Sequence, residues 1–254
     1  MQIIYINLDR HHERRARMET LLQGLPHQRL AAVDGKTLAS FDQAGQPATS
    51  SPLSPFELAC LHSHQQAAQL LLNSGAEYVC ILEDDVHLGT NFAEFMSDES
   101  WIPSLAHVVK LETMFQNLRL GQPVAARDRQ LHSLDSRHHG TAGYILSRLG
   151  AQQLIMKTQN PQLPLDHILF PDIAEQRSIL QISPALVVQD DVLARHLHNP
   201  AQIISSIQRA KVKRSMGATL LREASRIAQH IRVALHRART GIYTMSSAKK
   251  VDFE

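Results

Sequence analysis

Residues 78–85 of this chain read Tyr-Val-Cys-Ile-Leu-Glu-Asp-Asp, an apolar run of five residues followed by three carboxylates. A continuous apolar run of this length is typical of a central parallel strand that is covered on both faces. In open α/β sheets, ligands bind outside the carboxyl ends of the strands. We therefore expect a buried strand at Tyr78–Leu82 and a binding site at the acidic residues that follow it.

Strand and helix signals alternate on either side of this run. Ser54-Pro55 with Glu57 forms a capping box that begins a helix, and Gly75 is expected to end that helix in the left-handed conformation. Residues 40–55 are expected to form a loop because they are rich in Ser, Pro, Gly and Gln. The other expected strands are Met1–Leu8, Arg29–Val33, Ala106–Leu111, Thr141–Ser147 and Ile179–Val188, and the other expected helices are Arg10–Gly24 and Leu149–Lys157. This alternation predicts an α/β fold with a layered sheet.

The composition of the 254 residues is that of a soluble globular protein, with 43% hydrophobic and 20% charged residues. One Trp and 5% aromatic residues give little support for a base-stacking surface, so we expect no nucleic-acid partner. Cys60 and Cys80 are too few for a disulfide framework, and two buried thiols are favoured over one bridge. Because Ile3–Ile6 is too short for a signal peptide and no apolar stretch approaches the roughly 18 residues of a membrane span, we expect a cytoplasmic protein.

The formal net charge of +2 conceals two parts of opposite sign. Residues 201–254 hold 11 Lys and Arg against 3 Asp and Glu, whereas residues 1–200 hold 15 against 21. The basic part also carries an apolar stripe at helical spacing, formed by Leu220, Ala224, Ile227, Ala228, Ile231, Ala234, Leu235 and Ala238. We expect one domain at 1–200 and a basic helical extension at 201–254. The stripe contacts either an anionic membrane surface, the domain itself or a second subunit.

The three carboxylates Glu83, Asp84 and Asp85 repel one another unless a cation or hydrogen-bond donors compensate them. Ligands that are all oxygens select Mg²⁺ or Mn²⁺ over zinc, and such an ion commonly bridges the phosphate oxygens of a substrate. The alternative is a solvated acidic turn. We favour the metal site because the strand before it is expected to be fully buried.

A second group of polar residues follows the first strand: Asn7, Asp9, Arg10, Arg14 and Arg15. In a parallel sheet this group lies at the same edge as the carboxylates. Arginine suits bidentate contact with phosphate, and Asp9 can accept from a ribose hydroxyl or a base N–H. The alternative is a solvated helix face.

Other common site motifs find no support. His62 and His64 point in different directions on a helix, and the neighbouring pairs His11-His12 and His138-His139 lack ligand spacing, so no zinc site is expected. The chain has no phosphate-binding glycine loop of the Walker or dinucleotide type and no nucleophile elbow.

The sequence resembles glycosyltransferase family 25, which includes bacterial lipooligosaccharide galactosyltransferases. The resemblance covers roughly residues 3–190 in the family's order. Its pieces are Ile6–Arg10 with Arg14 and Arg15, Ala32–Gly35, Leu53–Pro55 with Glu57 and Cys60, Ser63-His64, Ile81–Val86, Val109–Leu111, Gly143–Arg148 with Gly150-Ala151, and Pro164–Asp166. The loop at 40–52 and the basic tail depart from the family pattern.

The resemblance implies a GT-A-like catalytic domain, a UDP-sugar donor and inversion at the anomeric carbon. It implies that Asp85 binds a divalent metal, Mn²⁺ or Mg²⁺, with Glu83 directed toward the metal or the ribose. The expected donor-binding residues are Asn7, Asp9, Arg10, Arg14, Asp34, Glu83 and Asp84.

An inverting transfer also needs a base that deprotonates the acceptor hydroxyl. Asp166, in Pro-Leu-Asp-His, is the favoured candidate, with Glu112 and the pair Asp190-Asp191 as alternatives. Asp166 can instead be an ordinary helix cap.

The favoured function is transfer of galactose from UDP-galactose to a lipooligosaccharide or lipid-linked acceptor. The competing hypothesis is a non-catalytic or nucleic-acid-associated protein in which the basic tail is the working part.

Overall fold

The computed structural model describes residues 1–43, 52–171, 178–198 and 247–254. The strands are β1 (Gln2–Asn7), β2 (His27–Ala31), β3 (Tyr78–Glu83), β4 (Val86–Leu88), β5 (Val108–Lys110), β6 (Asn117–Ala126), β7 (Arg129–Leu134), β8 (Gly143–Ser147), β9 (Ile179–Ser183), β10 (Val187–Gln189) and β11 (Ser247–Lys250). The helices are α1 (His12–Leu21), α2 (Gly35–Gln43), α3 (Pro55–Asn73), α4 (Phe92–Ser97), α5 (Arg148–Lys157), α6 (Leu165–Leu169) and α7 (Asp190–His196). The apolar stripe of the basic extension lies outside the described residues.

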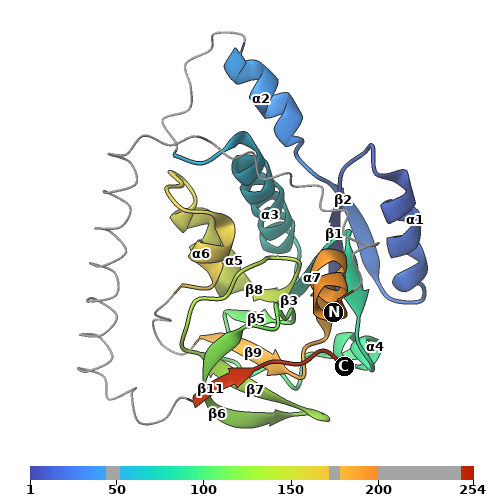
Figure 1. Cartoon of the computed structure of the whole chain (residues 1–254), viewed down its shortest axis with the longest axis vertical. Helices are drawn as coiled ribbons and strands as arrows, with labels where there is room; N and C mark the ends of the chain where they lie inside the picture. The colour runs from blue at the N-terminus through green and yellow to red at the C-terminus, as the bar shows by residue number, and fades with distance from the viewer. Residues whose placement is uncertain (44–51, 172–177, 199–246) are drawn as a thin grey trace.

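A mixed sheet of nine strands forms the centre of the molecule, in the order β11-β6-β7-β9-β5-β8-β3-β1-β2 (Figure 1). Strands β2, β1 and β3 are parallel to one another, whereas β8 runs antiparallel to both β3 and β5. Strand β10 pairs with β4 in a separate two-stranded sheet. The expected α/β class is confirmed, and the run at 78–82 is the inner strand that its apolar sequence predicts.

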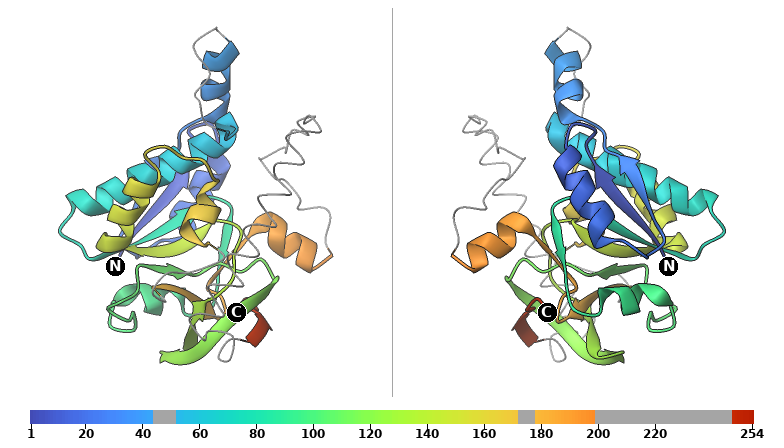
Figure 2. Two further views of the ribbon diagram at one scale, coloured as in Figure 1. Left: turned by 90° about the vertical axis from the view of Figure 1, so that its left-hand side faces the viewer. Right: turned by 90° about the vertical axis from the view of Figure 1, so that its right-hand side faces the viewer.

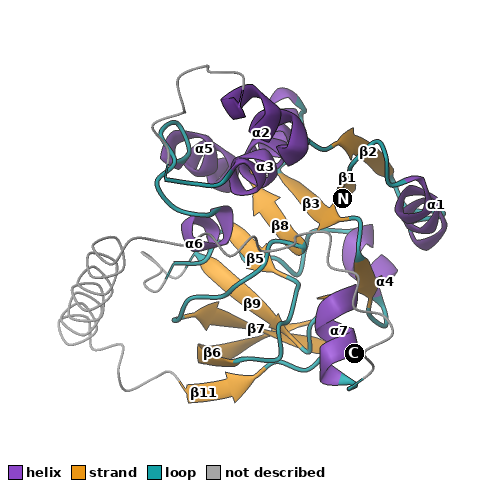
Figure 3. Cartoon of the chain, turned by 45° about the horizontal axis from the view of Figure 1, so that its top comes forward, coloured by secondary structure: helices purple, strands orange, loops and turns teal. Residues whose placement is uncertain are grey.

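Each face of the sheet is covered by its own helices. Alternate residues of β1 point to opposite sides, so that Ile3 and Tyr5 join one core cluster and Ile4 and Ile6 join the other. The first cluster contains residues of α1 and α4, and the second contains residues of α3, α5 and α6 (Figure 3). This cover on both faces explains why β1 and β3 are apolar throughout.

Helix α3 begins as the sequence predicts. The Ser54 hydroxyl accepts from the Glu57 amide, and the Glu57 carboxylate accepts from the Ser54 amide, which completes the capping box. Its end differs from the expectation. The C-cap is Ser74 in an extended conformation, and its amide donates to the carbonyls of Leu70 and Leu71, so a left-handed Gly75 is not used.

Two other expectations are corrected. The loop expected at 40–55 is wrong at its start, because α2 extends to Gln43; residues 44–51 lie outside the described residues. The helical pattern expected from 201 to the end is wrong at the C-terminus, where Ser247–Lys250 form β11 beside β6 (Figure 2). All four residues of β11 are exposed. A short polar edge strand has no apolar period that sequence analysis can detect.

The C-terminal residues after β11 are held firmly against the sheet domain. Val251 is fully buried, and its carbonyl accepts from the Thr113 hydroxyl at 2.6 Å. The main-chain oxygen of Glu254 accepts from Arg129 and from the Thr90 amide. Residues 247–254 therefore belong with the folded domain, and the expected boundary at 200 remains a prediction for the segment between.

Candidate active site

One edge of the sheet collects the polar groups. Strands β1, β3 and β5 all end there, at Asn7, Glu83 and Lys110. Strand β8 runs the opposite way and begins there, because Gly143 pairs with Leu82. The residues just before β8, including Thr141, therefore lie beside the carboxylates that follow β3.

Asp84 points into the protein. Only 7% of it is exposed, and its carboxylate accepts from the Asn7 side-chain amide at 2.7 Å and from Arg14 at 2.9 Å. The predicted meeting of the β1 and β3 ends is confirmed by these contacts. Because its oxygens are engaged by the protein, Asp84 fixes the turn that presents its two neighbours.

Glu83 and Asp85 face a common point. The side-chain amide nitrogen of Gln189, at the end of β10, lies 3.3 Å from Glu83 Oε2 and 3.3 Å from Asp85 Oδ1. Arg14 also reaches Asp85, at 3.3 Å. Two carboxylates that share one donor are arranged as two ligands of a single cation would be.

The two carboxyl groups differ in charge state. Burial, reinforced by the neighbouring Glu83, raises the pKa of Asp85 to about 7. Burial also acts to raise the pKa of Glu83, but His64 and Thr141 outweigh it and the pKa of Glu83 is lowered. The protein thus disfavours the ionised form of Asp85, and a divalent cation between the two carboxylates would favour that form.

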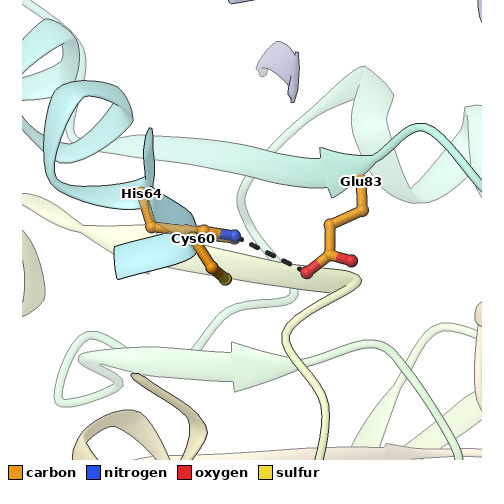
Figure 4. A group of neighbouring side chains, drawn as sticks. All are labelled: Cys60, His64 and Glu83. Carbon is orange, nitrogen blue, oxygen red and sulfur yellow. Dashed lines mark ion pairs between the residues drawn. The ribbon is translucent and has the colours of Figure 1, made fainter. Parts of the chain in front are cut away.

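A series of buried polar side chains contacts Glu83 from the interior of the protein. His64 Nδ1 lies 2.9 Å from the Tyr144 hydroxyl, and His64 Nε2 lies 3.6 Å from Glu83 Oε1. The Thr141 hydroxyl donates to the same Glu83 oxygen at 2.8 Å. Figure 4 shows His64 and Cys60 projecting from α3 toward Glu83 at the end of β3.

The polar residues at the end of β1 contact residues of β2 and of the segment after it. Arg29 contacts both Asn7 and the carboxylate of Asp9, and Arg10 contacts Asp34. Asp9 is largely exposed, with its side chain 81% accessible. These residues lie beyond the carboxylate pair, and their expected role in donor binding stays a prediction.

Asp166 lies in the first turn of α6, half-buried, with its carboxylate 3.3 Å from His139 Nδ1. Burial alone would raise the pKa of Asp166, but His139 and His167 outweigh it and lower the pKa below its ordinary value. Asp166 is therefore ionised at neutral pH. Its Oδ1 accepts from the His167 amide, so it stabilises the helix turn as well.

The alternative bases are all engaged elsewhere. Glu112 is fully buried against Lys110. Asp190 pairs with Arg17 and His87, and Asp191 pairs with Arg195 four residues later in α7. Their placement gives each of them a structural partner, whereas Asp166 is partnered by a histidine that is half exposed.

Two groups of side chains among the described residues have ligand atoms close enough together to hold a metal: Cys60, His64 and Glu83, and His139, Asp166 and His167. Sequence reasoning did not find them, because each joins residues from separate elements. For a hard cation, the oxygen ligands of Glu83 and Asp85 are the better match. Both cysteines are free, as expected.

Sequence reasoning also missed Gln189, Thr141 and Tyr144 as parts of the site. Gln189 directly follows the strand expected at 179–188, and Thr141 is the first residue of the strand expected at 141–147. Only their position at strand ends is a usable signal, because a single Gln or Thr carries no spacing pattern.

Residues 1–169 match the family model described as glycosyltransferase family 25 (LPS biosynthesis protein). A lacto-N-neotetraose biosynthesis glycosyltransferase, LgtB, of Neisseria gonorrhoeae is 36% identical over 152 residues, which cover 54% of each chain. A putative glycosyltransferase of Haemophilus influenzae is 32% identical over 69% of this chain and 62% of the relative. The chain therefore spans only about half the length of the first of these relatives.

Among solved structures, similarity is low. A glycosyltransferase involved in glycosylation of the major capsid of PBCV-1 gives a TM-score of 0.39 at 11% identity, covering 78% of this chain and 97% of that one. The galactosyltransferase LgtC gives a TM-score of 0.36 at 9% identity, covering 74% and 86%. The family model, in contrast, matches well over half of the sequence, and it includes the strand and the carboxylates from which the site is built. The chain belongs to glycosyltransferase family 25.

Proposed function

We propose that this chain is a metal-dependent, inverting glycosyltransferase with a GT-A-like catalytic domain. It transfers galactose from UDP-galactose to a lipooligosaccharide-type acceptor. The observation that carries the proposal is the pair Glu83 and Asp85 in a family 25 chain. Their carboxylates converge on the side-chain amide of Gln189 at the carboxyl end of a central strand. The lipooligosaccharide acceptor is supported by the description of the family as LPS biosynthesis proteins and by a further relative, the lipooligosaccharide biosynthesis protein lex-1 of Haemophilus influenzae, which is 29% identical over 71% of this chain.

In the proposed reaction Asp85 and Glu83 hold Mn²⁺ or Mg²⁺. When bound, the ion neutralises the charge that develops on the UDP leaving group. Asp84 keeps the acidic turn in place through Asn7 and Arg14. The side-chain amide of Gln189 occupies the point that the two carboxylates share, so a cation held there would replace its contacts with Glu83 and Asp85.

Asp166 is proposed as the base. Its low pKa means that it is ionised before the acceptor binds, so that it can take the proton of the acceptor hydroxyl as the new bond forms. His139 orients the carboxylate. The outer residues Asp9, Arg10 and Asp34 are proposed to contact the nucleoside part of the donor.

The direct test is a panel of UDP-sugars with Mn²⁺, scored for slow hydrolysis in the absence of acceptor. We expect UDP release from UDP-galactose that EDTA abolishes and Mn²⁺ restores. If UDP is released from another UDP-sugar and not from UDP-galactose, that sugar nucleotide is the donor. No release from any donor, with or without a lipooligosaccharide acceptor, would favour the non-catalytic alternative, in which the basic tail is the working part.

Membrane contact through residues 201–254 is a separate proposal. No helix in the described part of the chain is long and apolar enough to cross a bilayer. A lipid-linked acceptor nevertheless makes a position on the cytoplasmic face of the membrane useful. The basic residues Arg222, Arg226, Arg232, Arg237 and Arg239 accompany the apolar stripe. Each contributes about 1 kcal/mol near an anionic surface.

We expect the double variant Arg232→Gln/Arg237→Gln to bind anionic vesicles about 30-fold more weakly, since two charges contribute about 2 kcal/mol. The measurement is co-sedimentation of the full chain with phosphatidylglycerol vesicles at low and high salt. Full-length variants are needed because residues 247–254 belong to the sheet. The matched control, Lys36→Gln/Lys157→Gln, removes two exposed charges of the domain. Equal loss in both variants, or no binding at all, would assign the stripe to the domain or to a second subunit.

A further inference from the structure

A fully buried ion pair lies beneath the candidate active site and is not used by the proposed reaction. Lys110, the last residue of β5, and Glu112 are each 0% exposed, and Lys110 Nζ lies 2.7 Å from Glu112 Oε2. Both groups are within electrostatic range of Glu83, and Lys110 is also within range of Asp166. The pair is therefore close to Glu83, and its lysine is also close to Asp166.

The pair forms hydrogen bonds with the backbone of residues 139–142, the segment that precedes β8. Lys110 Nζ donates to the carbonyls of His139, at 3.1 Å, and Gly140. Glu112 Oε2 accepts from the Ala142 amide at 3.0 Å. A Cβ added to Gly140, whose φ is +82°, would lie 2.6 Å from Glu112 Oε1. Three positions of this segment, 139, 140 and 142, thus contact the pair directly.

This segment carries one side chain toward each half of the site. The Thr141 hydroxyl donates to Glu83, and the His139 ring contacts Asp166. Lys110 Nζ also lies 4.2 Å from the centre of the Phe170 ring. Phe170 caps the C-terminus of α6, where its amide donates to the main-chain carbonyl of Asp166. The pair is thus connected to Asp166 through His139 and through Phe170, and to Glu83 through Thr141.

We propose that Lys110 and Glu112 are positioning residues that set the distance and orientation between the Glu83 side and the Asp166 side of the active site. Burying two charges is costly, and well-packed apolar residues often replace such a pair without loss of stability. A role in stability alone therefore explains the pair poorly. A charged pair that fixes three backbone groups of one segment gives the orientation that apolar packing does not supply.

The proposal rests on the proposed function, and its test uses the full chain with the donor that the UDP-sugar panel identifies. The single variant Lys110→Met leaves Glu112 buried without a cation, so both stability and turnover fall. The double variant Lys110→Met/Glu112→Gln removes both charges and keeps an acceptor for the Ala142 amide. We expect the double variant to melt at a higher temperature than the single one, while kcat stays at least tenfold below wild type and KM for the donor changes less than threefold.

The matched control is Arg148→Met. Arg148 also donates to several backbone carbonyls, but these belong to Leu71, Leu72, Ser74 and Ala76 at the far end of α3. We expect it to lower the melting temperature and leave kcat within threefold of wild type. A double variant that regains wild-type kcat together with its stability would show that the pair is structural only.

Coupling to Thr141 gives the second readout. If Lys110 acts by holding the segment that presents Thr141, its effect on kcat is smaller in a Thr141→Val background than in the wild type. Independent, multiplicative effects of the two substitutions would contradict the proposal. Should the wild-type chain turn over no donor, the proposed function has failed. The positioning role is then judged by Mn²⁺ affinity, which Lys110→Met/Glu112→Gln must weaken relative to Arg148→Met.

Discussion

Asp85→Asn is expected to abolish metal-dependent turnover while leaving the fold intact. A bound cation contributes several kcal/mol to transition-state stabilisation. Each 1.36 kcal/mol corresponds to a factor of ten, so we expect a loss of about 100-fold or more. The measurement is UDP release at saturating Mn²⁺. The control is Asp98→Asn, which removes an exposed carboxylate paired with Arg127. A variant with wild-type rates would show that the metal site has been assigned wrongly.

The same substitution is expected to stabilise the metal-free protein at high pH. Burial raises the pKa of Asp85 from 3.8 to about 7, so the folded state binds its proton more tightly than the unfolded chain does. Ionisation of Asp85 therefore lowers the free energy of unfolding progressively as the pH rises from about 4 to about 7. Replacement by Asn removes this loss.

The gain in melting temperature should thus be largest at pH 8 and smallest near pH 4, and Mn²⁺ should raise the melting temperature of the wild type but not of the variant. A variant that is less stable at pH 8 would show that Asp85 is needed for the fold, through Arg14 or Gln189.

The elements that carry the site could be predicted because their signals are local. The apolar run at 78–82 shows a covered strand, and the carboxylates at its end locate the site by the geometry of α/β sheets alone. The capping box at Ser54 fixes the start of α3, which carries His64. In each case a few neighbouring residues contain the whole signal.

The remaining parts depend on contacts between distant residues. Strand β11 is polar and exposed, and its place beside β6 is set by pairing across more than 120 residues of sequence. Gln189 reaches Glu83 and Asp85 because β10 pairs with β4, which no spacing in the sequence reveals. The antiparallel direction of β8 brings Thr141 to the carboxylates, whereas a fully parallel sheet would have placed it at the opposite edge.

Asp166→Asn is expected to lower turnover by about 100- to 10,000-fold, the usual contribution of a general base. Donor affinity should stay near the wild-type value, because a base acts on the acceptor hydroxyl in the transition state. The measurements are kcat with acceptor present and the dissociation constant of the UDP-sugar by calorimetry. Asp166 and His167 share the first turn of α6, so part of any effect can come from the helix itself.

Asp191→Asn is the matched control for that contribution. Asp191 is likewise an acidic residue in the first turn of a short helix, but it pairs with Arg195 on the same helix. If both variants lose similar stability and only Asp166→Asn loses turnover, the loss belongs to the reaction. A fall in donor affinity that matches the fall in turnover would instead assign Asp166 to donor binding. Asp190, which lies beside Asp85 through the hydrogen bond from its amide to the Asp85 carbonyl, would then be the next candidate for the base.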